Sequence, residues 1–156
     1  MLYYAYGSNM DWSQMKERCP SAKFVAVAEF PNHRLAFTRK SRDRGCGVSD
    51  VVPDINGNVW GVVYEIAETE IGLLDRREGY RPGRDRMENS YIREVRHVLR
   101  DGDKNEPLLV SIYIGIPQDN PPKPNAEYQR LLVDGAIRWR LPQKYIEKLK
   151  QISTEG

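Results

Sequence analysis

The sequence is poor in the residues that most often build metal centres and disulfide frameworks. Its 156 residues include only two cysteines and two histidines. Cys19 and Cys46 fit no metal-ligand spacing and are too few for a disulfide framework, and with His33 and His97 they offer too few soft ligands for zinc. We therefore expect no metal site and expect both cysteines to be small core or loop residues, with a Cys–His nucleophilic pair as the alternative.

Long hydrophobic runs and a strong charge of one sign are also missing. No apolar run approaches the length of a membrane span, and the N-terminus has neither a basic segment nor a signal cleavage site. The 24 Lys and Arg residues nearly balance the 22 Asp and Glu residues, and the net charge of +2 implies no general attraction to nucleic acid or membrane. With 40% hydrophobic and 29% charged residues, the chain is predicted to form one cytoplasmic domain over residues 1–156. The sequence leaves open whether the protein forms a homodimer.

The first ten residues combine a strand, a polar loop and a helix start. Residues 2–6 are an aromatic-rich run of strand formers, which breaks at Gly7, Ser8 and Asn9. Asp11 is predicted to be the N-cap of a helix, with Gln14 completing a capping box. Such a loop leaves backbone N–H groups that can face a ligand, but an ordinary strand-to-helix turn fits the same residues.

The remaining sequence alternates between strand patterns and two-residue turns before it becomes helical. Pro31-Asn32 and Asn56-Gly57 are turn signals, and the second predicts a tight hairpin. Strands are predicted over residues 2–6, 24–30, 34–39, 46–52, 59–65, 91–99 and 108–114, and helices over 11–18, 67–77, 126–139 and 142–152. The fold class is therefore α+β: a mainly antiparallel curled sheet or small β-barrel of about six to seven strands with flanking helices.

Glu78 is an acidic residue at an unfavourable place in a predicted helix. It lies in the last turn, before Gly79, which can supply the left-handed residue that ends the helix. A carboxylate there faces the negative end of the helix dipole, which raises its pKa, and burial would raise the pKa further, as suits a general acid–base. From the residues alone, the favoured interpretation is a surface glutamate whose pKa is lowered again by Arg76, Arg77 or Arg81.

Two segments concentrate basic residues. Residues 40–45 (Lys-Ser-Arg-Asp-Arg-Gly) form a polar loop, for which a solvated loop is the favoured interpretation and an anion-binding patch the alternative. Arg81, Arg84 and Arg86 follow Glu78 in a second such segment. A protein that binds an acidic partner through both loops is therefore one functional hypothesis, although the low net charge argues against it.

Taken together, these segments resemble the γ-glutamylcyclotransferase family, which includes the plant AIG2-like proteins. Each motif is weak alone, but their order and spacing match over nearly the whole chain. The matching residues are 3–10 (Tyr-Tyr-Ala-Tyr-Gly-Ser-Asn-Met), 60–64 (Trp-Gly-Val-Val-Tyr), 74–79 (Leu-Asp-Arg-Arg-Glu-Gly), Tyr91, 124–128 (Pro-Asn-Ala-Glu-Tyr) and 135–145.

The resemblance implies an enzyme that needs neither metal nor cofactor. Family enzymes cleave a γ-glutamyl amide by intramolecular attack of its α-amine, which releases 5-oxoproline and a free amine or amino acid. The family's catalytic glutamate falls on Glu78, which would act as base and then as acid. The implied substrate-binding residues are Tyr3, Tyr4, Ala5, Tyr6, Gly7, Ser8, Asn9 and Tyr91. A non-catalytic module that binds a small acidic ligand is the alternative.

Two departures from the family pattern bear on this interpretation. Asn125 stands where the family often has serine, and asparagine can still cap a helix. The segment from Gly79 to Tyr91 is longer and more basic than in the glutathione-pathway enzymes of the family. A longer loop beside Glu78 could reshape the pocket for the leaving group, so the identity of the amine partner is left open.

Overall fold

Five strands close into a barrel in the computed structural model, which describes residues 1–155. The barrel order is β1-β3-β2-β4-β5, in which the β1–β5 pair is parallel and the other pairs are antiparallel. The chain runs through β1 (Leu2–Ala5), η1 (Ser8–Met10), α1 (Trp12–Arg18), β2 (Lys23–Lys40), β3 (Gly47–Glu65), η2 (Glu68–Glu70), α2 (Ile71–Arg77), η3 (Arg86–Glu88), β4 (Tyr91–Arg100), β5 (Pro107–Gly115), α3 (Ala126–Arg138) and α4 (Gln143–Lys150). The predicted α+β class and the antiparallel barrel are confirmed.

The predicted strand count is too high because two turn signals do not reverse the chain. Residues 23–40 form one strand and residues 47–65 another, so seven expected strands become five. Pro31 pairs with Asn58 and His33 with Pro53, which leaves only Asn32 on β2 opposite residues 54–57 on β3. The two turn signals thus face each other, and together they make a bulge within one long hairpin.

The strands separate two hydrophobic clusters because their side chains alternate between the two faces. Tyr4 and Tyr6 belong to a cluster built from strand residues such as Phe30 and Val63, which fills the barrel. Tyr3 and Ala5 belong to a second cluster that also includes helix residues. The expected candidate residues 3–6 therefore point alternately into the barrel and toward the helices.

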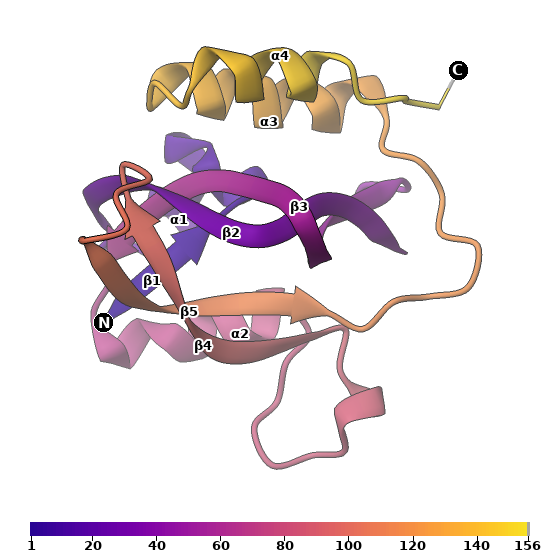
Figure 1. The fold of residues 1–156 in the computed structure, drawn as a ribbon. Coiled ribbons are helices and arrows are strands. Elements are labelled where there is room, and N and C mark those ends of the chain that lie inside the picture. Colours follow the sequence, from indigo (N-terminus) through magenta and orange to yellow (C-terminus); the bar gives the residue numbers. More distant parts are fainter. Residues whose placement is uncertain (156) are drawn as a thin grey trace.

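The helices cover the outside of the barrel. Figure 1 shows α3 and α4 side by side along the β2–β3 face, and α2 on the other side near β4 and β5. The predicted caps are confirmed at Asp11, which accepts from the Gln14 N–H at 2.9 Å, and at Asn125, which accepts from the Tyr128 N–H at 2.8 Å. Each such cap stabilises its helix by about 1 kcal/mol.

Two further expectations concern the whole chain. Both cysteines are buried with free thiols, as predicted for core residues. Among the helices of residues 1–155, none is long and apolar enough to cross a membrane.

Candidate active site

A cavity of about 750 Å³ opens at one end of the barrel, where four distant parts of the chain meet. Its wall includes the loop after β1, the end of α2, the start of β4 and the turn of the β2–β3 hairpin. Glu78 and Tyr91 both line it, together with Tyr3, Tyr4, Tyr6, Gly7, Ser8 and Asn9. The structure thus brings Glu78 and the opening loop, some seventy residues apart in sequence, into one pocket.

The side chains of the opening loop are held by a polar network. Asn9 donates to the Tyr3 hydroxyl at 2.9 Å, and its carbonyl oxygen accepts from Gln14 and from Arg18. Gln14 also donates to the Ser8 hydroxyl at 2.9 Å. The predicted capping box is therefore only half formed: Asp11 caps the helix, while the Gln14 side chain turns away to the loop. This network fixes the loop while occupying the Ser8 and Asn9 side chains.

The backbone of the same loop is available for a ligand. Within residues 1–155, the N–H groups of Gly7, Ser8 and Asn9 donate to no protein acceptor. A Cβ on Gly7 would come within 2.1 Å of the Ser49 hydroxyl oxygen, so a larger residue here would displace that hydroxyl from its hydrogen bond with Tyr128. Adjacent unsatisfied N–H groups facing a cavity suit a carboxylate or an oxyanion.

Three predicted binding residues in β1 or directly after it have different surroundings. The Tyr4 hydroxyl donates into the barrel, to the carbonyl oxygens of Ala28 and Val59, although Tyr4 also borders the cavity. Ala5 is buried and does not border the cavity. Tyr6 borders it while donating its hydroxyl to the Tyr113 carbonyl oxygen.

Glu78 is positioned by the turn that ends α2. Gly79 has φ of +65°, its N–H donates to the Arg76 carbonyl oxygen, and the Tyr80 N–H donates to that of Asp75 at 2.9 Å. These two bonds form a Schellman motif, which confirms the predicted role of Gly79. Glu78, one residue earlier, is the C-cap residue and is held directly over the cavity.

The surroundings of Glu78 favour its neutral form. Burial raises the pKa of Glu78 to about 7, while the positive charge of Arg18 opposes that rise. No hydrogen bond from residues 1–155 stabilises the carboxylate. Glu78 is half-buried in the cavity wall, so the surface glutamate that the residues alone favoured is wrong. A carboxyl group with this pKa can both take and return a proton near neutral pH.

Tyr91 forms part of the wall of the cavity. Its hydroxyl donates to the Ser49 carbonyl oxygen at 2.7 Å, and its side chain is buried. Burial raises the pKa of Tyr91 well above its usual value, and the negative charge of Glu78 raises it further. Tyr91 therefore lies close to Glu78 as a neutral phenol whose proton is already shared with the backbone.

Several cavity residues were not singled out from the sequence. Arg18 and Arg39 line the wall, and Tyr128 reaches it from α3 to bond the Ser49 hydroxyl at 2.8 Å. Residues 40–44 line the cavity too, so the basic loop is not merely solvated. Single arginines and helix tyrosines carry no local signal in the sequence, because only folding brings them to the site.

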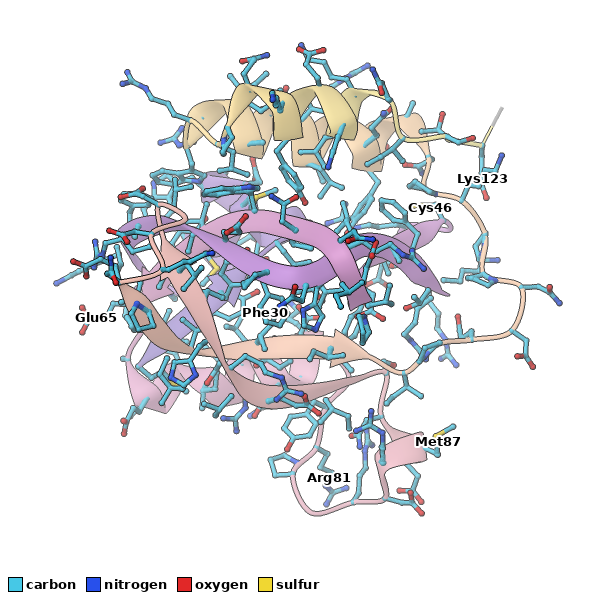
Figure 2. The ribbon with its side chains drawn as sticks, viewed as in Figure 1. Phe30, Cys46, Glu65, Arg81, Met87 and Lys123 are labelled. Carbon is cyan, nitrogen blue, oxygen red and sulfur yellow. The ribbon has the colours of Figure 1, made fainter. Side chains whose placement is uncertain are left out.

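The second basic segment lies elsewhere. None of residues 81–89 borders the cavity, and Figure 2 shows Arg81 and Met87 on a loop that projects from the barrel, far from Cys46 at the hairpin turn. Arg84 donates to the Gly79 carbonyl oxygen at 3.0 Å and to Asn89, so this segment braces the turn that holds Glu78. The segment can act on the cavity through this turn, but it does not itself border the cavity.

The cavity wall combines arginines and tyrosines with two carboxyl groups, Asp43 and Glu78. Within residues 1–155, no three His, Cys, Asp or Glu side chains gather in a way that could hold a metal ion. The residues present suit proton transfer at Glu78 and the binding of anionic groups by arginines and backbone N–H groups.

Comparison with known proteins finds relatives over most of the chain. The sequence model of the AIG2-like family matches residues 58–149. Gamma-glutamylcyclotransferase from Mus musculus is 30% identical over 155 residues, covering 97% of this chain and 78% of its own. The protein of the same name from Homo sapiens is 29% identical with the same coverage.

The fold also matches that of solved structures. A solved gamma-glutamyl cyclotransferase superposes with a TM-score of 0.88 at 26% sequence identity, over 99% of this chain and 89% of the other. The family match spans the end of α2 and the strands beyond it, and the whole-chain relatives include the opening loop as well. This chain therefore belongs to the γ-glutamylcyclotransferase family of AIG2-like proteins and is an enzyme of that type.

Proposed function

We propose that the protein converts a small γ-glutamyl amide into 5-oxoproline and a free amine or amino acid, with Glu78 as the proton-transfer group. The observation that carries this proposal is the Glu78 carboxyl group: it borders the cavity, receives no protein hydrogen bond within residues 1–155, and has a pKa of about 7. Beside a bound substrate, such a group is a base for one ammonium and an acid for another.

Glu78 would move protons between two nitrogens of one substrate. It takes a proton from the α-ammonium, and the neutral nitrogen attacks the γ-carbonyl carbon, forming the ring C–N bond. The tetrahedral intermediate then collapses and the original amide C–N bond breaks. Both protons lost by the attacking nitrogen end on the departing nitrogen, so no water or co-reactant is consumed. Because nucleophile and carbonyl belong to one molecule, holding the glutamyl chain in a bent conformation supplies much of the acceleration.

The opening loop would bind the glutamyl group through its backbone. The N–H groups of Gly7, Ser8 and Asn9 are unused by the protein and lie in the wall that Glu78 shares. They can receive the α-carboxylate or the oxyanion of the intermediate, since both are anionic oxygens. The side-chain network around Asn9 and Gln14 keeps these donors in place before substrate arrives.

A screen for 5-oxoproline release tests the proposal. Purified protein is incubated with γ-glutamyl amino acids, γ-glutamyl amines and glutathione, and 5-oxoproline is measured by chromatography. Glu78→Gln keeps the shape of the side chain and removes its proton transfer, so we expect the rate to fall by about 10²- to 10⁴-fold. Glu88→Gln, on the exposed second basic segment, is the matched control and retains activity.

The outcomes separate the two functional classes. Release that persists in Glu78→Gln at the wild-type rate would exclude the proposed mechanism. Binding of these compounds, seen by calorimetry, with no release from any of them would instead support the non-catalytic module.

A further inference from the structure

The cavity wall carries a positive charge that the chain as a whole does not have. Two acidic residues, Asp43 and Glu78, line the wall, against seven basic ones: Arg18, Arg39, Lys40, Arg42, Arg44, Arg76 and Arg77. The wall thus has a formal excess of five positive charges, whereas the net charge of all 156 residues is +2. The rest of the molecule is therefore net acidic, and the cationic excess is specific to the cavity.

None of these seven basic side chains forms an ion pair within residues 1–155. The ion pairs of that part of the chain lie elsewhere, as between Arg93 and Asp75 at 3.0 Å. Arg18 and Arg39 instead donate to neutral oxygens, those of Asn9 and Ile116. Positive charges gathered without counter-charges repel one another, and a concave wall concentrates their field on a bound ligand.

Arg44 is held ready for an anion. Its guanidinium donates to the Gln14 side-chain oxygen at 2.8 Å and lies 5.2 Å from the ring centre of Tyr128. Tyr128 is itself fixed by Ser49, and Gln14 by Ser8. A guanidinium restrained on two sides loses less conformational entropy when it binds a carboxylate, and it keeps N–H groups for the ligand.

The γ-glutamyl group does not match this charge by itself. Its α-carboxylate and α-ammonium cancel, so negative charge must come from the amine that leaves. A cationic or neutral amine would leave the excess unmatched, while an amino acid with a second carboxylate would place two anionic groups near the wall. A cavity of about 750 Å³ has the size of a small-molecule site and can take a dipeptide.

We propose that the preferred substrates are γ-glutamyl compounds of dicarboxylic amino acids, such as γ-glutamyl-glutamate, with Arg44 and Arg42 selecting the side-chain carboxylate. This inference rests on the proposed function, because the same cyclisation takes place: the α-nitrogen bonds the γ-carbonyl carbon, the amide C–N bond breaks, and glutamate leaves with its amine protonated. The specificity thus depends on the hairpin turn, while the proton transfer depends on Glu78.

Two substrates that differ in one charge test the inference. We expect kcat/KM for γ-glutamyl-glutamate to exceed that for γ-glutamyl-glutamine at least tenfold at low ionic strength, with a smaller ratio in 0.5 M NaCl because salt screens the attraction. Arg44→Gln and the exposed Arg42→Gln should each reduce the ratio several-fold. Arg81→Gln, an equally basic position outside the cavity, should leave the ratio and the rate unchanged.

Each result has a distinct meaning. Equal kcat/KM for the two substrates, with release still dependent on Glu78, overturns the specificity and leaves the proposed function intact. No release from any γ-glutamyl compound overturns the proposed function itself. A tenfold preference that survives both Arg42→Gln and Arg44→Gln overturns the assignment to these two arginines, and the exposed Arg42 keeps this test usable if Arg44→Gln unfolds.

Discussion

Two arginine-rich segments, residues 40–44 and 81–86, look alike in the sequence and differ in the structure. The first forms the turn of the long hairpin and lines the cavity; the second lies on a projecting loop outside it. The charges of the first act on whatever the cavity holds, while the second braces the end of α2 through Arg84. Basic composition therefore indicates a binding site only where the fold also supplies a concave surface and leaves the charges unpaired.

The largest effect is expected in the pH dependence of the rate. The pKa of Glu78 should respond to the removal of a positive charge inside the cavity and not to the removal of one outside it. Because the base must be ionised and its pKa is about 7, kcat/KM should fall about tenfold per pH unit below that pH, reaching roughly 100-fold at pH 5. Arg18→Gln removes the positive charge that lowers this pKa, so the acid limb of the profile should move to higher pH by about half to one unit. Arg81→Gln should not move it.

This prediction is tested by measuring kcat/KM against pH for the wild type, Arg18→Gln and Arg81→Gln. An acid limb with the same midpoint in Arg18→Gln and wild type would show that Arg18 does not act on the group that titrates.

The turn that ends α2 and the second segment that braces it are compared at two left-handed glycines, Gly79 in the turn and Gly83 in the segment. Gly79 has φ of +65° and a Cβ there would meet Ser90 at 2.8 Å, so Gly79→Ala should cost about 2–3 kcal/mol and lower Tm by roughly 5–10 °C. Gly83 has φ of +86° with nothing within 4 Å, so Gly83→Ala is the matched control, costing only about 1 kcal/mol for the backbone. Thermal unfolding measures both.

The two variants should also differ in activity. Gly79→Ala displaces Glu78 and should lower kcat, while Gly83→Ala should not. Equal losses of kcat in both would mean that the turn after α2 does not position the carboxyl group.

Burial of Glu78 should also make the stability of the protein depend on pH. The folded state holds the Glu78 proton more tightly than the unfolded chain, whose pKa is about 4.5, so the wild type loses stability as pH rises from 4.5 through about 7. Gln does not titrate. The Tm of Glu78→Gln relative to wild type should therefore rise over this range, by roughly 2–5 °C, and level off above about pH 8.

Calorimetric Tm values at pH 5, 6, 7 and 8 test the sign. Glu88→Gln, at an exposed position, should show no such trend. A Tm difference for Glu78→Gln that does not change with pH would mean that Glu78 titrates like an exposed glutamate.

The smallest effect on kcat/KM is expected when the second segment loses positive charge but keeps Arg84, whose hydrogen bond to Gly79 supports the end of α2. Arg81→Gln with Arg86→Gln removes two positive charges and leaves Arg84 in place, so kcat/KM should change by less than about twofold. Steady-state kinetics at low salt give the comparison with Arg42→Gln. A tenfold loss in the double variant would mean that the two segments act alike on the substrate.

Much of the local structure could be predicted from residues a few positions apart. The caps at Asp11 and Asn125 and the left-handed Gly79 each depend on hydrogen bonds that span three to five residues. The helices and most strand segments follow from periodicity for the same reason. The resemblance to the family supplied the hypothesis for Glu78 and the opening loop, and their meeting in one cavity agrees with it.

The sequence by itself determined most of the helical and extended segments, most of the helix ends, and which family the chain resembles. Only the tertiary structure decided that the turn signals at 31–32 and 56–57 face each other as a bulge, because each turn is shaped by the strand paired with it. It also decided which basic segment borders the cavity, and that Tyr128 reaches Ser49, 79 residues away. Contacts over such distances depend on how the whole barrel closes, which no local pattern encodes.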